Sequence, residues 1–336
     1  MNSARPEAPH TRILNSYNCC SRTQQNCESD SLMHFLTITH TPEIPILRLQ
    51  ARSMARFLDA SCTASIMVIC NESDFISFHE RFKLEVLSEY GELRTKVSVL
   101  HRSALAQPKN WGHGWRSQQL LKLLAIRYLG DGIVLVLDSK NHFVSPITEA
   151  SYQTNDGRLR TWKTHHIGHM ERNFRASVSA FGIDADSVIH AWPPSITPFP
   201  VRAADVRECL DVVTQASADR FFEEFLQQRC LMTEFFLITA YQKQKYGDLA
   251  VPYEFGQLLS ATLFRDKVVD PKKFESLMFI AYRPSTLSFA IHHGAFAVLD
   301  EQQRRRISDL WLARGLIASS EQAESFLVAP YGRYGQ

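Results

Sequence analysis

The stretch from Gly114 to Pro146, GWRSQQLLKLLAIRYLGDGIVLVLDSKNHFVSP, is the part of the chain that decides the fold. Apolar residues at helical spacing predict an amphipathic helix over residues 116–129. A Gly-Asp-Gly turn leads into residues 133–137, which hold no polar side chain and are typical of a central strand in a parallel sheet. This strand ends at Asp138, and open α/β folds bind ligands at the carboxyl ends of such strands. We therefore expect a ligand site around Asp138.

Strands and helices alternate in the chain before this stretch. β-branched and apolar runs predict strands over residues 34–39, 66–70 and 97–100. Helical spacing of apolar residues predicts helices over residues 44–58 and 75–90. The β-α-β-α-β-α-β order predicts an α/β fold, a Rossmann-type mixed sheet that is mostly parallel and has helices on both faces.

Polar residues follow three of the predicted strands. Thr39 and His40 follow the first, Asn71 the second and Asp138 the fourth. Right-handed crossovers place the carboxyl ends of parallel strands along one edge of the sheet. We therefore expect these four residues to lie near one another and to bind a ligand.

The first half of the predicted helix carries Gln118, Gln119 and Lys122 among its apolar residues. These side chains either face the same edge, where the positive end of the helix attracts anions, or form an ordinary solvated surface. Asp138 has two interpretations as well. It either caps the following loop, or it binds a hard cation beside a nucleotide diphosphate.

The alternation fails after Pro146. We expect a polar leader over residues 1–31 that is disordered, a nucleotide-sugar-binding half over 32–150, and an acceptor-side half over 151–336 that extends the same sheet. The segments that we predict in the last part are strands over 158–163 and 287–291, a Pro-broken edge segment over 195–201, and helices over 168–181, 203–214, 218–229, 233–246 and 302–314.

Composition excludes several classes of protein. A net charge of +2 argues against a nucleic-acid partner, and no apolar run approaches the roughly 18 residues of a membrane span. The first thirty residues lack a hydrophobic signal core, and seven cysteines, an odd number, suit reduced thiols. These features predict a cytoplasmic protein.

The central stretch resembles the GT-A-type glycosyltransferases. Among them it is similar to the DUF6492 group of bacterial proteins, which are largely uncharacterised and whose pattern is roughly G-W-x-x-QQ-L-x-K-L followed by L-x-x-D-S-D-x-x-F-x-x-P. The matching residues are Gly114, Trp115, Gln118, Gln119, Leu120, Lys122, Leu123, Asp138, Ser139, Phe143 and Pro146. Two weaker matches to the same group are residues 233–237, which resemble its S-E-Y-x-L-Y segment, and residues 289–292, which resemble its late strand ending in histidine. The resemblance implies a GT-A-like fold, a nucleotide-sugar donor and a glycan or glycolipid acceptor, which is compatible with peripheral contact with a membrane.

The resemblance also implies roles for single residues. Asp138 would hold a divalent metal, Mn or Mg, against the donor diphosphate, and His292 would be a late metal or phosphate ligand. Glu234 would be the base that deprotonates the acceptor hydroxyl. Glu234 has a structural alternative as a first-turn carboxylate behind the helix cap Thr233, and His292 has one as an ordinary buried histidine.

Lys140 departs from the pattern, because it stands where the second aspartate of D-x-D is expected. An ammonium group repels a cation, which puts the metal in doubt. Three hypotheses follow. Lys140 replaces the metal and meets the diphosphate, the site has lost catalysis, or Lys140 points away and Asp138 and His292 hold the metal.

Two other functions compete with a transferase. One is a catalytically inactive protein that binds a nucleotide sugar or acts as a scaffold. The other is a nucleotidyltransferase, which the sequence disfavours because residues 39–42 after the first strand contain no glycine-rich phosphate loop.

Overall fold

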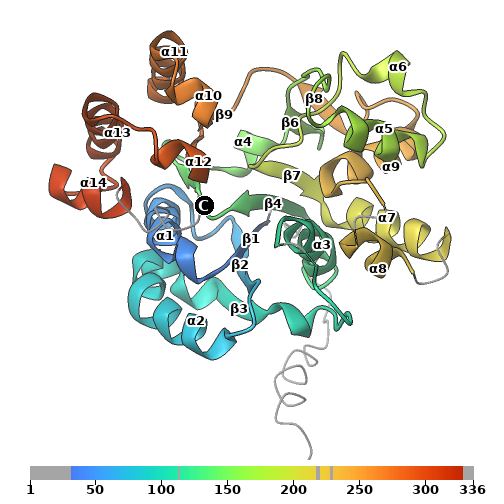
Figure 1. Cartoon of the computed structure of the whole chain (residues 1–336), viewed down its shortest axis with the longest axis horizontal. Helices are drawn as coiled ribbons and strands as arrows, with labels where there is room; N and C mark the ends of the chain where they lie inside the picture. Colours follow the sequence, from blue (N-terminus) through green and yellow to red (C-terminus); the bar gives the residue numbers. More distant parts are fainter. Residues whose placement is uncertain (1–31, 113, 217–219, 228–229, 328–336) are drawn as a thin grey trace, which may run out of the picture.

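The computed structural model describes residues 32–112, 114–216, 220–227 and 230–327, so the predicted leader lies outside the described residues. A five-stranded sheet in the order β3-β2-β1-β4-β7 forms the centre of the molecule (Figure 1). Its strands are β1 (Met33–Thr39), β2 (Thr63–Cys70), β3 (Val97–His101), β4 (Ile133–Asp138) and β7 (Phe199–Arg202). The first four are parallel and β7 is antiparallel to β4. The predicted mixed, mostly parallel sheet is confirmed.

The strand order reverses direction between β1 and β4. The chain runs outward from β1 to β2 and β3, and then returns to place β4 on the other side of β1. Ile38 of β1 pairs directly with Asp138, so the two carboxyl ends lie side by side. Such a reversal is the point at which open α/β sheets bind ligands.

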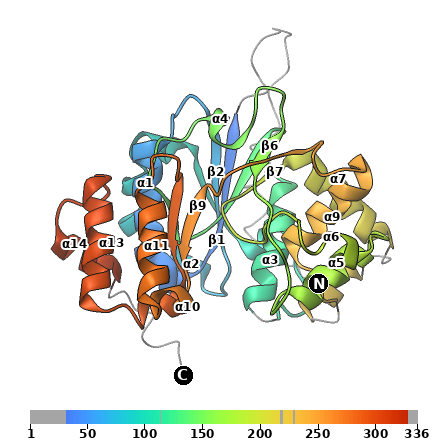
Figure 2. The same cartoon turned by 90° about the horizontal axis from the view of Figure 1, so that it is seen from above.

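Helices cover both faces of this sheet, as Figure 2 shows. Phe35, Leu135 and Leu137 pack on one face with α1 (Ile44–Phe57). Residues of the opposite parity, Leu36 and Val136 among them, pack on the other face. That second layer consists of α3 (Gly114–Ile126), α7 (Ala203–Ala216) and α9 (Glu234–Tyr246). The alternation of side chains along each strand therefore gives every buried strand two apolar faces.

The segment predicted as one helix over 75–90 is irregular. It begins as α2 (Phe75–Arg81), continues as a π turn (Phe82–Val86) and ends as a 3-10 stretch (Leu87–Lys96). Gly91 lies inside the last part with φ 53° and ψ −126°, a conformation that favours glycine and interrupts the helix. The predicted helix ends just before Gly91, and helical spacing did not predict the π turn and the 3-10 stretch that replace its second half.

Most of the late strands do not join the main sheet. Only β7 extends it, as an edge strand in which Pro200 pairs with Leu135. The other sheets are β5 (Asn141–Phe143) with β10 (Ser288–Ile291) and β9 (Ser260–Leu263), and β6 (Leu159–Thr161) with β8 (Tyr253–Phe255). The expectation that the late strand 287–291 extends the same sheet is wrong, because it pairs instead with β5 and β9, which the sequence analysis did not predict as strands.

The remaining helices surround these sheets. They are η2 (Thr41–Glu43), η5 (Arg102–Ala104), α4 (Glu149–Tyr152), α5 (Glu171–Ser179), α6 (Ala185–Val188), α8 (Phe221–Leu226), α10 (Arg265–Val268), α11 (Pro271–Tyr282), α12 (His293–Phe296), α13 (Glu301–Ala313) and α14 (Ser320–Leu327). The helices α11 and α13 lie with α14 at one corner of the molecule in Figure 1 and share a separate apolar core with β9 and β10. Within the described part of the chain, no helix is long and apolar enough to cross a membrane.

Candidate active site

A cavity of about 770 Å³ opens where the carboxyl ends of β1 and β4 meet. Its walls come from the start of α3, the turn after β4, the start of α9 and the ends of β9 and β10. Two further segments, residues 162–170 and 194–197, complete it. The reversal of strand order and this cavity therefore coincide.

The turn after β4 is fixed by side-chain amides. Asn141 Oδ1 accepts the backbone N–H of Asp138 at 2.7 Å, and Asn141 Nδ2 donates to the Thr197 carbonyl at 3.2 Å. Gln50 Nε2, from α1, donates to the carbonyls of Asp138 at 2.8 Å and of Asn141 at 2.9 Å. Because these groups are buried and paired, the direction of the Asp138 side chain is set by the fold.

The Asp138 carboxylate has three partners. Lys122 Nζ lies 3.0 Å from Oδ1, while Oδ2 accepts from Thr197 Oγ1 at 2.9 Å and forms an ion pair with Lys140 Nζ. Burial alone would raise the pKa of this carboxyl, but the attraction of Lys122 and Lys140 outweighs burial and holds the pKa well below its usual range. Asp138 is therefore an ionised group, and Lys140 does not point away from it.

Glu234 is the second carboxyl of the cavity. It is 5% exposed, it begins α9, and its Oε1 lies 3.2 Å from the same Lys122 Nζ. Burial raises the pKa of Glu234, and Lys122 only partly offsets that effect. The two carboxylates in turn raise the pKa of Lys122 against the effect of its burial. Thr233 occupies the cap position but its side chain makes no cap hydrogen bond.

A third acidic residue, Glu43, lies on the β1 side of the cavity. Glu43 Oε2 is 3.2 Å from His40 Nδ1 and accepts from Thr39 Oγ1 at 3.1 Å. Burial would raise the pKa of Glu43, but its contacts with His40 and Ser139 lower it. Burial would likewise lower the pKa of His40, and Glu43 raises it. These residues form a compact group beside the end of β1.

The structure brings most of the predicted site residues together. All of them except Thr39 and Asn71 line the cavity. Thr39 is buried against Glu43, and Asn71 Nδ2 donates to Ser117 Oγ at 2.9 Å, which ties the end of β2 to the start of α3. Both are at the predicted edge, but their side chains support the walls.

Several residues of the cavity were not predicted. Glu43, Thr197 and His293 belong to no motif, and they reach the site only because η2, the segment before β7 and α12 fold against it. Trp162, His165 and His169 also line it.

The side chains at the predicted metal site do not fit a divalent cation in this arrangement. Both Asp138 oxygens face ammonium groups. His292 Nδ1 accepts the backbone N–H of Gly294 at 3.3 Å, so the neutral ring carries its proton on Nε2, where a metal would have to bind. Among the residues that the structure describes, no group of three His, Cys, Asp or Glu side chains is placed to hold a metal.

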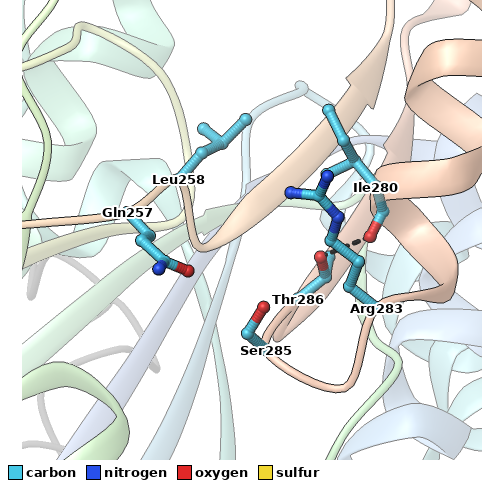
Figure 3. A pocket seen from close by; sticks show the side chains of 6 residues that line it. All are labelled: Gln257, Leu258, Ile280, Arg283, Ser285 and Thr286. Atoms are coloured by element: carbon cyan, nitrogen blue, oxygen red, sulfur yellow. Dashed lines mark hydrogen bonds between the residues drawn. The ribbon is translucent and has the colours of Figure 1, made fainter.

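A smaller cavity of about 240 Å³ lies away from these residues, between the end of α11 and the chain before β9 (Figure 3). Its only charged residue is Arg283, and Thr286 Oγ1 beside it already donates to the Ile280 carbonyl at 2.5 Å. It offers no acid or base pair, so we place the chemistry in the larger cavity.

The sequence matches no protein-family model, and no curated protein matches it. Solved structures with a similar fold include mouse xyloside xylosyltransferase 1, with 11% identity over 69% of this chain and 87% of that chain at a TM-score of 0.37. Galactosyltransferase LgtC, in complex with donor and acceptor sugar analogues, has 11% identity over 84% of this chain and 100% of that chain at a TM-score of 0.44.

The bifunctional glycosyltransferase WbbM is 13% identical over 79% of this chain, at a TM-score of 0.42. The match covers 46% of that longer protein. Likeness at these identities and TM-scores carries no conclusion about activity, so the function has to follow from the site.

Proposed function

We propose that this chain is a glycosyltransferase that moves a sugar from a nucleotide-sugar donor to a glycan or lipid-linked acceptor. The observation that carries the proposal is the series of paired charges Glu234, Lys122, Asp138 and Lys140 in the cavity at the end of β4, of which Glu234 and Lys122 are buried. It combines a carboxyl of raised pKa with two ammonium groups. Glycosyl transfer needs these two things, a proton acceptor and a stabiliser of the departing diphosphate.

Lys140 is the ammonium group that we assign to the diphosphate. Its side chain is 22% exposed, whereas that of Lys122 is 8% exposed and is held between two carboxylates. A ligand can therefore reach Lys140 first. Lys140 then supplies the positive charge that a divalent cation supplies at a D-x-D site, and the reaction needs no metal.

Glu234 is the residue that we assign to the acceptor. A general base must be ionised at the working pH and must be basic enough to take a proton. The raised pKa of Glu234 makes it a stronger base. Lys122, 3.2 Å away, favours its ionised form. Asp138 stays ionised and keeps both lysines charged.

We also propose a relationship with the DUF6492 group, on the strength of the residues matched between Gly114 and Pro146. A cytoplasmic location, where the donor is available, belongs to the same proposal.

Turnover of a panel of UDP-, GDP- and CMP-sugars tests the proposal. We expect hydrolysis or transfer of at least one sugar in the presence of EDTA, measured as nucleotide release. Turnover that needs added Mn²⁺ or Mg²⁺ would refute the role of Lys140 while leaving a transferase in place.

Two substitutions sharpen this test. Lys140→Met removes the charge and should weaken UDP binding about 10- to 100-fold, the effect of losing one charged hydrogen bond. Lys140→Asp rebuilds the acidic pair and should make UDP binding depend on Mn²⁺. Calorimetry with and without Mn²⁺ measures both, and Lys267→Met, a surface lysine outside the cavity, is the control.

An inactive nucleotide-sugar-binding protein is the second candidate. The observation that favours it is that Lys140 is already paired with Asp138, which lowers its availability to a ligand. Binding of a nucleotide sugar without any hydrolysis or transfer across the panel would establish this alternative.

A further inference from the structure

Arg116, on the first turn of α3, is an arginine buried to 2% exposure, and the described part of the chain offers it no ion pair. Its guanidinium instead donates to backbone carbonyls. Nε reaches Phe225 at 3.0 Å, Nη2 reaches Cys230 at 2.9 Å and Nη1 reaches Met232 at 2.7 Å. Its Cζ also lies 3.8 Å from the centre of the Phe225 ring. Arg116 thus holds the chain that leads into α9.

The same guanidinium determines the orientation of Gln119. Arg116 Nη1 lies 2.9 Å from the end of the Gln119 side chain, one turn along α3. Arginine has only donors, so the Gln119 atom that faces it must be the carbonyl oxygen Oε1. The choice between the two possible orientations of this amide is therefore settled by chemistry.

The amide nitrogen of Gln119 is then left for another partner. Gln119 is 3% exposed and lines the cavity, and across residues 32–112, 114–216, 220–227 and 230–327 its Nε2 has no hydrogen-bond acceptor. Because Gln119 lines the cavity, a ligand oxygen bound there can accept from Nε2.

We propose that Arg116 is a positioning residue, which fixes the Gln119 amide so that Nε2 donates to an oxygen of the bound nucleotide sugar. This inference rests on the proposed function, and it adds a neutral donor on α3 to the ammonium group of Lys140. Arg116 acts only through Gln119 and does not line the cavity.

Two substitutions of Gln119 separate binding from stability. Gln119→Glu keeps an oxygen for Arg116 and removes the N–H donors, so we expect UDP affinity to fall about 10- to 100-fold with no loss of thermal stability. Gln119→Met removes the donors without adding charge, so affinity should fall similarly. It also leaves an Arg116 donor unpaired, which should lower the melting temperature by about 2–4 °C or more.

A double-substitution cycle tests the positioning role. If Arg116 acts through Gln119, Arg116→Met should weaken UDP binding in the wild-type background and have little further effect in Gln119→Met. A purely structural arginine would give independent, additive losses. The Gln119 variants decide the matter if Arg116→Met does not fold.

Calorimetry with UDP, GDP and CMP, together with thermal melting, provides the measurements. Wild-type protein that binds none of these nucleotides would overturn the proposed function, and this inference with it. Wild-type protein that binds UDP while Gln119→Glu binds it equally well would overturn this inference alone. So would a Gln119→Met variant as stable as wild type, since it would mean that Oε1 does not pair with Arg116.

Discussion

Asp138 and Glu234 share one ammonium partner, yet their surroundings move their pKa values in opposite directions. Asp138 also faces Lys140 and Thr197, and its pKa is lowered, whereas burial raises the pKa of Glu234 and its contact with Lys122 offsets this only in part. Two carboxyl groups whose pKa values are pushed apart are suited to different tasks in one reaction.

Glu234→Gln should therefore abolish transfer and spare donor binding. The amide cannot accept a proton, and we expect kcat to fall by about 10²-fold or more, the usual contribution of a general base. The Kd for UDP, measured by calorimetry, should stay within about threefold of wild type. The control is Glu223→Gln, which changes an exposed residue of α8. An unchanged kcat in Glu234→Gln would show that Glu234 is not the base.

The same two carboxyls should give stability a pH dependence of opposite sign. A raised pKa in the folded state means that Glu234 favours folding below its ordinary value of 4.5 and loses that contribution as pH rises through the folded pKa. Wild type should therefore lose stability relative to Glu234→Gln between pH 4.5 and neutral pH.

Asp138 has a lowered pKa, so its contribution is present above the ordinary value of 3.8 and is lost as the pH falls below it. Wild type should be more stable than Asp138→Asn at pH 7, and the difference should shrink in acid. Urea unfolding at a series of pH values measures both differences. Parallel curves for wild type and the two variants would contradict these assignments.

The turn after β4 is the element that orients the side chains of Asp138 and Lys140. Asn141 Oδ1 and Nδ2 bind two backbone groups, the N–H of Asp138 and the carbonyl of Thr197, and Asn141 itself is 2% exposed. Asn141→Ala leaves both buried groups unpaired and should reduce the free energy of unfolding by about 2–4 kcal/mol. Affinity for UDP should fall as well, because Asp138 and Lys140 lose their fixed direction.

Asn110→Ala is the matched control for Asn141→Ala in urea unfolding. Asn110 also accepts a backbone N–H, that of Gly112 at 2.8 Å, but it is exposed, so water can replace it. We expect a loss below about 1 kcal/mol. Equal losses in the two variants would show that the turn after β4 is not held by Asn141.

At the scale of the whole molecule, the C-terminal helices are joined to the site through one buried pair. Trp311 of α13 donates from Nε1 to His142 Nε2 at 2.7 Å. Indole nitrogen can only donate, so His142 carries its proton on Nδ1, which faces the Lys140 carbonyl at 3.3 Å. Burial lowers the pKa of His142 to about 3, so the ring is neutral.

Trp311→Phe should reduce the free energy of unfolding by about 1–3 kcal/mol, because His142 Nε2 stays buried and loses its donor. Urea unfolding followed by circular dichroism measures the loss. Trp111→Phe, at a half-buried position, should cost less than about 1 kcal/mol. An equal effect of the two substitutions would exclude a special contribution of the Trp311–His142 pair.

The sequence by itself determined the four parallel strands, the helices between them and the edge at which Asp138 lies. These features depend on local patterns: strands with two apolar faces, helical spacing and a polar residue at a strand end. Gln119, Lys122 and Glu234 were also identifiable, because they belong to a motif or begin a helix. The same local patterns missed the π turn (Phe82–Val86) and the 3-10 stretch that follows it.

Only the tertiary structure decided which strands pair and which side chains contact one another. The strands β5 (NHF) and β9 (SATL) lack the apolar run that identified β10, so their pairing with β10 was not predicted. Lys122 contacts Asp138 and also Glu234, which lies 112 residues further along the chain. Arg116 likewise donates to the carbonyl of Met232, 116 residues further along the chain. The stretch from Gly114 to Pro146 supplies the charged groups, but packing of α9 against α3 sets their partners, and thereby their pKa values and their possible chemistry.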